Sequence, residues 1–327
     1  MSDFHFSPRP NRAREVEWRE WGAEAFKEAQ EQDKLILLDI GAVWCHWCHV
    51  MDETTYSDPQ VIRLLNERFI PLRVDNDERP DVNRRYNMGG WPTTAVLTPT
   101  GEALTGATYM PANEMTQMLV QLSEAFKQAK EAILSKAREV DVRREAMLTN
   151  RGAARGELSD EIVTNVRKAL KEGFDTLYGG FGDAPKFPAW EALELALATY
   201  HETGDEDYRA LVTITLKRVL MGEMYDPVEG GFFRYATQRD WTVPHYEKML
   251  EDNARWLNLL MHAYQVTERA EYLEVIRSLV DYVETHLRDD KQDGFFGSQD
   301  ADEEYYALEK AGRAKRAAPY IDRTLYT

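Results

Sequence analysis

Cysteine is scarce in this chain of 327 residues: there are only two, Cys45 and Cys48. Two cysteines three positions apart cannot cross-link distant parts of a fold, so a framework of structural disulfides is excluded. Their closeness indicates redox chemistry or, as the alternative, a metal site. Structural zinc usually needs a second pair of ligands, and haem attachment at a Cys-x-x-Cys-His pattern needs export.

Long apolar runs are missing as well. No stretch approaches the roughly 20 residues that a membrane-spanning helix needs. The first six residues, MSDFHF, lack the basic start and apolar stretch of a secretory signal peptide. We therefore expect no membrane partner and a cytoplasmic location, where thiols are mostly reduced.

Basic residues are outnumbered, with 40 Lys and Arg against 57 Asp and Glu, which gives a formal net charge of −17. A negative excess repels nucleic acid and anionic membranes, so neither is expected as a partner. Hydrophobic residues make up 43% and charged residues 30%, as in a globular protein with a core. The length suggests two domains.

The first 150 residues alternate between short apolar runs and helical patterns. The apolar runs predict strands at 35–40, 70–75, 93–98 and 103–108, the last two forming a hairpin. The helical patterns predict helices within 14–31, from residue 45, and at 59–68, 80–87 and 113–148. The expected fold of this part is α/β.

The most linker-like stretch is NRGAARG at 150–156, and we place the boundary there, with domains at 1–150 and 151–327. Helices are expected near 159–174, 189–203, 206–222, 248–268 and 270–288. Between them, Asp175–Phe181 matches Asp226–Phe232 and, with Asp293 replacing a glycine, Asp289–Phe295. This repeat predicts helical hairpins that return to a Gly-Gly-Phe turn whose Phe packs inward.

The candidate redox site is the segment from Asp39 to Cys48. A cysteine at a helix N-terminus faces unpaired N–H groups and the positive end of the helix dipole, which lower its pKa. We therefore expect Cys45 to be the exposed, attacking sulfur and Cys48 to resolve the mixed disulfide. A cationic His46 would stabilise the thiolate and make the pair more oxidising. Asp39, buried beneath the site, would take the Cys48 proton.

Several motifs resemble a known family. The order of Asp39, the Trp44–Cys48 motif and Pro92-Thr93 is similar to that of a thioredoxin domain. More narrowly, WCHWCHVM at 44–51 resembles the thioredoxin-domain family that includes the spermatogenesis-associated protein of animals. The same resemblance extends to three further segments: GGWPT at 89–93, GGFGDAPKFP at 179–188 and PHYEKML at 244–250.

This resemblance implies a thioredoxin-like α/β domain followed by an all-α (α/α)6 toroid similar to six-hairpin glycosidases and sugar epimerases. In the thioredoxin fold a cis proline faces the cysteine pair and binds the substrate backbone. Pro92 matches that place, and Trp44, Trp91 and Thr93 are the neighbouring substrate-contact candidates.

The chain also departs from the family pattern. The stretch EVEW at 15–18 replaces an Asn-Pro-Val-Asp-Trp opening, and Glu251 stands where Tyr is expected. Family members continue well beyond Thr327, so we expect an incomplete toroid. Its exposed apolar stripe would permit self-association; the stripe comprises Met249, Trp256, Leu257, Leu260, Met261 and Tyr264.

The predicted function is thiol–disulfide exchange with a protein or small-molecule partner, without bound cofactor or metal. Two alternatives stay open. The toroid would be a carbohydrate-active epimerase or hydrolase, or the thioredoxin fold would be a non-catalytic binding module. The second-domain acid–base candidates, which would otherwise cap helices and tie loops, are Asp240, His245, Glu247, Asp300 and Asp302.

Overall fold

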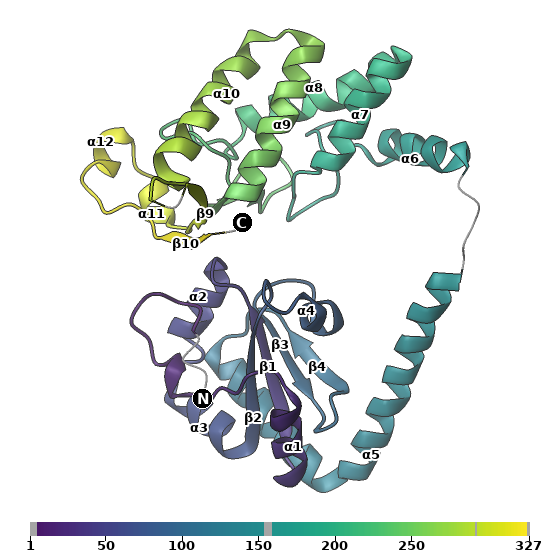
Figure 1. Ribbon diagram of the computed structural model, residues 1–327, viewed down its shortest axis with the longest axis vertical. Coiled ribbons are helices and arrows are strands. Elements are labelled where there is room, and N and C mark those ends of the chain that lie inside the picture. Colours follow the sequence, from purple (N-terminus) through teal and green to yellow (C-terminus); the bar gives the residue numbers. More distant parts are fainter. Residues whose placement is uncertain (1–4, 154–158, 292, 326–327) are drawn as a thin grey trace. The chain divides into compact units, whose positions relative to one another are not determined.

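The structure is a computed structural model that describes residues 5–153, 159–291 and 293–325. The chain divides into two compact units, residues 1–156 and 157–327. Figure 1 labels the elements of both units, which are described separately below.

The first unit is built on a four-stranded sheet of order β2-β1-β3-β4. β1 and β2 are parallel, whereas β3 pairs antiparallel with both β1 and β4. The strands are β1 (Leu35–Gly41), β2 (Phe69–Asp75), β3 (Thr93–Leu97) and β4 (Ala103–Ala107). The first three are buried along their whole length, which accounts for their almost continuous apolar sequence.

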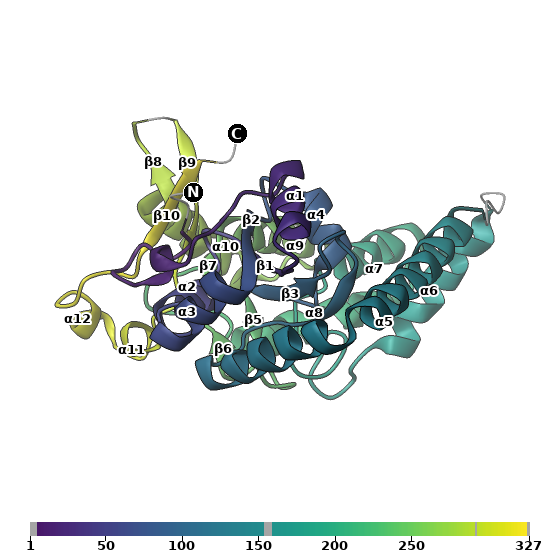
Figure 2. The same cartoon turned by 90° about the horizontal axis from the view of Figure 1, so that it is seen from below.

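Helices cover both faces of this sheet. They are η1 (Ala13–Glu15), α1 (Ala23–Glu31), α2 (His46–Glu53), α3 (Pro59–Arg68), α4 (Pro80–Tyr86) and α5 (Ala112–Ala153). Successive side chains of a strand point to opposite faces. Ile36 and Leu38 therefore join the core with α1 and α4, and Leu35 and Leu37 join the core with α3 and α5. Figure 2 shows these two helical layers on either side of the strands.

The second unit consists mainly of helical hairpins. Its helices are α6 (Asp160–Gly173), α7 (Trp190–Thr203), α8 (Glu206–Met221), α9 (Leu250–Thr267), α10 (Ala270–Tyr282), the π-helical turn η2 (Val283–Leu287), α11 (Glu303–Tyr306) and α12 (Lys310–Arg313). α7 packs on α8, α9 packs on α10, and α7 also contacts α9. The expected fold class, a thioredoxin-like α/β domain followed by the α/α hairpins of a toroid, is confirmed.

Short strands connect these helices and were not expected from the sequence. They are β5 (Tyr235–Ala236), β6 (Pro244–His245), β7 (Lys248–Met249), β8 (Arg288–Asp289), β9 (Gly294–Gln299) and β10 (Ile321–Leu325). β10, β9 and β7 form one sheet with β8 on β9, and β5 pairs with β6. The two-residue strands β5, β6, β7 and β8 are too short to leave a periodic signal in a sequence.

The first two repeated turns share their backbone geometry. Gly179 and Gly180 in one turn, and Gly230 and Gly231 in the other, have φ between +70° and +80°. A Cβ atom at Gly230 would lie 2.6 Å from the backbone oxygen of Ser278. Glycine is thus required both by the left-handed backbone and by the close approach of α10.

Each of these turns is closed by a carboxylate that holds a lysine and an arginine. We call each such set of one Asp, one Lys and one Arg an ion node. In the first ion node, Asp175 Oδ2 accepts from Lys186 Nζ and from Arg239 Nε, both at 2.8 Å.

In the second ion node, Asp226 Oδ2 accepts from Lys248 Nζ at 2.7 Å and from Arg313 Nη1 at 2.6 Å. The recurrence of the Asp-Lys-Arg set shows that the repeat is structural and not a coincidence of turn residues.

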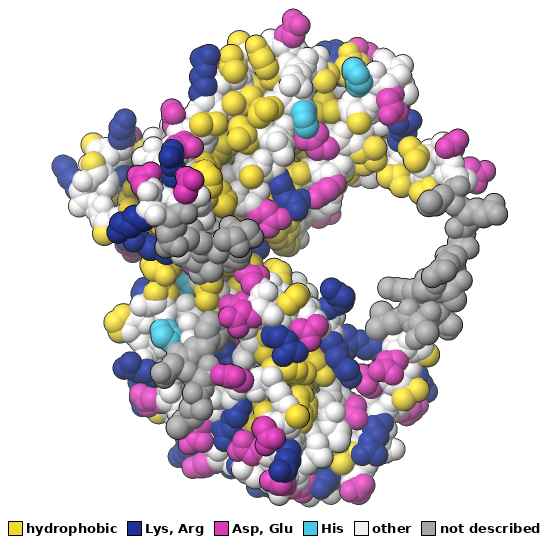
Figure 3. Space-filling view, in the orientation of Figure 1, with side chains coloured by type: hydrophobic (Ala, Val, Ile, Leu, Met, Phe, Trp, Pro, Cys, Tyr) yellow, Lys and Arg dark blue, Asp and Glu magenta, His cyan; other side chains and the backbone are white. Residues whose placement is uncertain are grey.

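Two expectations about apolar side chains were wrong. The third turn is part of the β8–β9 hairpin, where Phe295 pairs with Arg288 and is 36% exposed instead of packed inward. In the proposed exposed stripe, Trp256 and Leu260 are fully buried because α9 packs between α7 and α10. Met261 of the same stripe is exposed, and Figure 3 shows hydrophobic side chains gathered on the visible face of this unit, with charged ones mostly around them.

Candidate functional site

Cys45 lies where the chain leaves β1 and enters α2. It is the N-cap residue of α2, and its Sγ accepts a hydrogen bond from the Cys48 backbone N–H at 3.2 Å. The expectation of an exposed sulfur was wrong, because Cys45 is only 5% exposed. The reason is the capping geometry itself: the side chain turns back over the first helical turn and away from solvent.

Cys48 lies one turn further along, completely buried, and both cysteines are free thiols. Burial is the main cause that raises the pKa of Cys48 well above its ordinary value, followed by the hydrogen bond that its thiol makes to Cys45. The end of β1 must be small here, because a Cβ on Gly41 would lie 3.0 Å from Cys48 Sγ and 2.6 Å from the Phe6 ring.

A buried ionic network lies beneath this pair and was missed by the sequence analysis. Arg73 of β2 donates from Nε to Asp39 at 2.9 Å and from Nη2 to Asp52 at 2.6 Å, and all three are fully or almost fully buried. The parallel register of β1 and β2 places Asp39 directly beside Arg73. One signal in the sequence pointed to it: Asp39 and Arg73 are charges of opposite sign within two otherwise apolar runs.

The same network holds the start of the chain against α2. Asp52 Oδ2 accepts from the backbone N–H groups of Phe6 and Ser7, at 3.0 and 3.1 Å. Phe6 in turn packs over the Arg73 guanidinium, 4.9 Å from its ring centroid. The amino-terminal segment therefore covers the cysteine pair from the side of Gly41.

Asp39 carries one unsatisfied oxygen in this network. Its Oδ1 is buried without a hydrogen-bond partner, while Oδ2 is bound by Arg73. Burial raises the pKa of Asp39 to about 6, in spite of the opposing attraction of Arg73. A buried carboxyl with such a pKa can change its protonation near neutral pH, as the proposed proton acceptor of Cys48 must.

The aromatic and imidazole side chains around the motif have distinct placements. His46 is half-buried in the first turn of α2, whereas His49 is buried and contacts the Val43 carbonyl oxygen through Nε2 at 2.7 Å. Trp44 is buried and its indole N–H donates to Asp77 Oδ2 at 2.8 Å. Trp47, by contrast, is exposed and is the large apolar surface next to the motif.

The loop before β3 lies against the cysteine loop. The peptide bond between Trp91 and Pro92 is cis. Trp91 contacts Trp44 edge-to-face, with ring centroids 5.5 Å apart, so the two tryptophans join the loops. Thr93 is buried and its hydroxyl donates to the Gly90 carbonyl oxygen at 2.7 Å, which fixes the loop.

The structure brings two of the second-unit candidates, His245 and Glu247, into contact. His245 Nε2 lies 3.6 Å from Glu247 Oε2. Asp240 instead accepts from the backbone and hydroxyl of Thr242, and Asp302 caps α11. Asp300 is buried and accepts from the adjacent Ala301 N–H at 2.8 Å.

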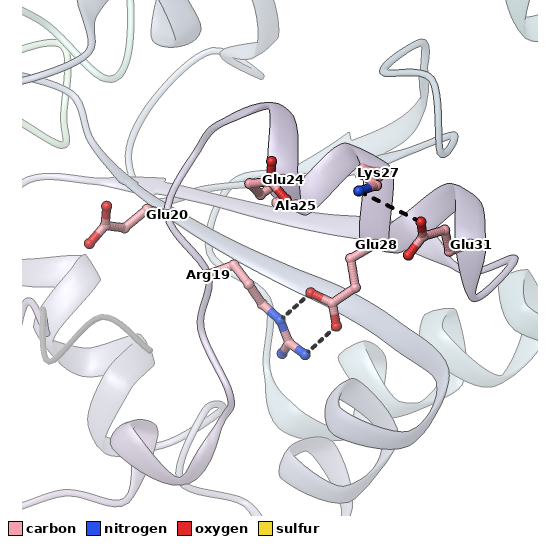
Figure 4. Close-up of a pocket in the computed structure, with 7 residues that line it drawn as sticks. All are labelled: Arg19, Glu20, Glu24, Ala25, Lys27, Glu28 and Glu31. Carbon is pink, nitrogen blue, oxygen red and sulfur yellow. Dashed lines mark hydrogen bonds and ion pairs between the residues drawn. The ribbon is translucent and has the colours of Figure 1, made fainter.

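One hollow on the surface of the first unit contains neither the cysteine pair nor any of the candidate acid–base residues. It lies along α1, and Figure 4 shows that four of its charged side chains form two pairs, Arg19 with Glu28 and Lys27 with Glu31. Within the described residues, no group of three His, Cys, Asp or Glu is placed to hold a metal ion. The described helices include none that is long and apolar enough to cross a membrane.

Comparison with known proteins decides the family. Spermatogenesis-associated protein 20 of Homo sapiens is 34% identical over 329 residues, which covers 94% of this chain and 41% of that protein. The chain is a homologue of spermatogenesis-associated protein 20. Residues 9–145 match the family Thioredox_DsbH, described as a protein of unknown function, DUF255. The chain spans about two fifths of the length of these curated relatives.

More distant similarities cover one unit each. The thiol:disulfide interchange protein DsbD of Pseudomonas fluorescens is 32% identical over 109 residues, 31% of this chain and 18% of that protein. Among solved structures, a Thermus thermophilus thioredoxin is 30% identical, with TM-score 0.30, covering 33% of this chain and 88% of its own. Cellobiose 2-epimerase from Spirochaeta thermophila is 16% identical, with TM-score 0.36, and the match covers 47% of this chain and 43% of the epimerase chain.

Proposed function

We propose that the first unit is a thiol–disulfide oxidoreductase in which Cys45 and Cys48 exchange disulfides with a protein or small-molecule partner. The observation that carries this proposal is the pairing of the two thiols across the first turn of α2. Cys45 Sγ accepts the Cys48 N–H at 3.2 Å, so negative charge on Cys45 meets a backbone donor at the positive end of the helix.

In the reducing direction, the Cys45 thiolate attacks one sulfur of the partner disulfide. The partner's S–S bond breaks, its second sulfur leaves as a thiolate, and a mixed disulfide forms. Cys48, as thiolate, then attacks Cys45 Sγ and releases the first partner sulfur. The partner gains two electrons and two protons, and an external dithiol reductant must reduce the resulting Cys45–Cys48 disulfide.

The buried network supports a division of roles between the two sulfurs. The raised pKa keeps Cys48 protonated while Cys45 attacks the partner, so that Cys45 alone is the nucleophile of the first step. Asp39, with its free Oδ1 and a pKa of about 6, is the residue proposed to accept the Cys48 proton. Arg73 is a positioning residue, since it holds Asp39 between the strands.

The burial of Cys45 restricts how a partner approaches. Cys45 is only 5% exposed, and we propose that the partner approaches it beside the Trp91–Thr93 loop. Trp47, exposed beside the motif, and Trp91 are the residues proposed to contact the partner there. His46, in the first turn of α2, is proposed to tune the redox potential when it is cationic.

The two cysteine variants provide a matched test. Cys48→Ser should trap a stable mixed disulfide with a disulfide substrate such as oxidised glutathione or insulin, whereas Cys45→Ser should trap none. The unaltered chain should form a reversible Cys45–Cys48 disulfide with a potential between about −120 and −270 mV in a glutathione titration.

Mass spectrometry of non-reduced samples reads out the trapped species. If Cys48→Ser traps nothing, or if the Cys45–Cys48 disulfide never forms, the exchange reaction is wrong. The first unit would then be a binding module in which the cysteines only pack.

A further inference from the structure

The amino-terminal strap, by which we mean residues 6–9, is tied to the end of α2. Ser7 Oγ donates to Glu53 Oε1 at 2.6 Å, and Arg9 Nε donates to the same oxygen at 2.7 Å. Phe6 and Ser7 are buried. The exchange reaction proposed above gives this strap no role, although the strap contacts the ionic network beneath the cysteine pair.

The ring of Phe6 occupies a space that a larger residue than glycine at position 41 would close. A Cβ on Gly41 would lie 2.6 Å from the Phe6 ring and 3.0 Å from Cys48 Sγ, so the ring and the sulfur both lie against the end of β1. The same ring packs over the Arg73 guanidinium, which lies 4.9 Å from its centroid. Phe6 therefore helps to keep water away from both Cys48 and Arg73.

The backbone of the strap completes the surroundings of Asp52. Asp52 Oδ2 accepts from the N–H groups of Phe6 and Ser7 at 3.0 and 3.1 Å. Arg73 adds two more donors, at 2.6 Å to Oδ1 and at 3.3 Å to Oδ2. Asp39 receives only Arg73 Nε on Oδ2, and its Oδ1 has no hydrogen-bond partner. The two carboxylates that share Arg73 are thus unequal, and the strap contributes to the difference.

We propose that the strap is a positioning element for the second step of the exchange reaction: it holds Asp52 in the ionised form and leaves Asp39 to take up the Cys48 proton. The inference rests on the proposed exchange reaction. In the second step the Cys48 proton moves to Asp39, a bond forms between the sulfurs of Cys48 and Cys45, and the partner's sulfur leaves as a thiolate. Phe6 is the positioning residue, since its ring and its N–H both contact the network.

The charges around Asp39 determine the direction of the expected effect. Burial raises the pKa of Asp39 to about 6, the attraction of Arg73 lowers it, and the charge of Asp52 raises it. Cys48 and Tyr56, which lies in the turn after α2, also face this carboxyl. Loss of the strap would admit water and would remove donors from Asp52, which would then hold its charge less firmly. Both changes lower the pKa of Asp39.

NMR of the full chain, labelled with carbon-13 aspartate, measures the pKa of Asp39, and Asp39→Asn assigns its signal. In Phe6→Ala the pKa should fall from about 6 to about 5 or lower. Phe6→Leu restores most of the apolar volume and should return the pKa towards 6. The protein is reduced and no partner is present, so this result does not depend on whether the exchange reaction occurs.

The pH profile of the second step is the functional readout. Release of the partner thiol from the mixed disulfide should have its midpoint near pH 6 in the unaltered chain and near pH 5 in Phe6→Ala. Because a weaker base removes the Cys48 proton more slowly, the plateau rate should fall about 3-fold. Rapid quenching and mass spectrometry measure the release. A merely structural role of Phe6 would lower the rate without moving the midpoint.

A second pair of variants isolates the backbone donor. Ser7→Pro removes an N–H that Asp52 accepts, whereas Ser7→Ala keeps this N–H and loses only the hydroxyl contacts. Ser7→Pro should lower the pKa of Asp39, and Ser7→Ala should leave it near 6. Circular dichroism checks folding, and this pair keeps the test decisive if Phe6→Ala does not fold.

Two outcomes overturn the proposal. One is a pKa of Asp39 that stays near 6 in the folded strap variants, and the other is a release midpoint that does not move in them. If Cys48→Ser nevertheless traps a mixed disulfide, the exchange reaction stands and only the role of the strap is wrong. Failure of the exchange reaction itself shows in a chain with an intact strap, as the lack of any trapped species.

Discussion

Asp39 in the first unit and Asp252 in the second are both buried carboxyls, with pKa values raised to about 6 and about 7. Their surroundings differ. Arg73 binds Oδ2 of Asp39 and also binds Asp52, which leaves Oδ1 of Asp39 without a hydrogen-bond partner. Oδ2 of Asp252 likewise has no hydrogen-bond partner among the described residues, and the charges of Arg234 and Arg255 oppose the rise of its pKa. The comparison teaches that burial raises both pKa values, and that a directly bound arginine offsets more of this effect at Asp39.

The largest effect is expected at Arg73, where one cation serves two buried carboxylates. Arg73→Met should lower the free energy of unfolding of the first unit by about 3–5 kcal/mol, since it leaves two buried charges uncompensated. Urea unfolding measures the loss. Arg79→Met, which removes an exposed pair with Asp81, is the control and should leave the midpoint almost unchanged. A loss at Arg73 as small as that of the control would mean that the network is not structural.

The two ion nodes of the second unit allow a buried arginine to be compared with an exposed one. Arg313 in the second node is 4% exposed, whereas Arg239 in the first is 49% exposed. Arg313→Ala should therefore cost about 2–3 kcal/mol of unfolding free energy, and Arg239→Ala should have little effect. The two variants are compared by thermal unfolding at equal salt. Equal effects would show that the two nodes, although alike in sequence, do not differ in burial in solution.

The smallest effect is expected at Asp252, and it has the opposite sign. Because the folded-state pKa is raised from 3.8 to about 7, the folded protein loses stability as the pH rises from about 4 to about 7, and the loss is constant at higher pH. The loss is absent below about pH 4, where Asp252 is protonated in both the folded and the unfolded chain. Asp252→Asn should therefore stabilise the chain by about 2 kcal/mol more at pH 8 than at pH 4. A stabilisation that does not change with pH would contradict the raised pKa.

Much of the fold could be predicted because its elements carry strong local signals. The helix expected at 59–68 is α3 with those bounds, fixed by Pro59 in its first turn and by the Asp58 side chain that caps it. The helix expected at 248–268 begins instead at Leu250, because Lys248 and Met249 pair with β9 as β7. Such two-residue pairings depend on distant partners, so no local pattern reveals them.

The site was predictable to a lesser degree, for a similar reason. Cys45 and Cys48 stand out by type and spacing, and the helix start between them follows from the preceding strand. The partner of Asp39 cannot be recognised in this way. Arg73 is 34 residues away in the sequence and becomes the neighbour of Asp39 only through the parallel register of β1 and β2. His245 and Glu247 were both among the candidates from the sequence, whereas Asp252 was missed because a carboxylate on a helix usually faces solvent.

The ion nodes also set an order for the folding of the chain as it is synthesised. The first ion node is complete only after Arg239 has been synthesised, 64 residues after Asp175. The second ion node is complete only after Arg313 has been synthesised, 87 residues after Asp226. Because Lys248 and Arg313 end up in the interior while Arg239 stays at the surface, a nascent chain that stalls between positions 248 and 313 holds a lysine and a carboxylate that lack the arginine of their node.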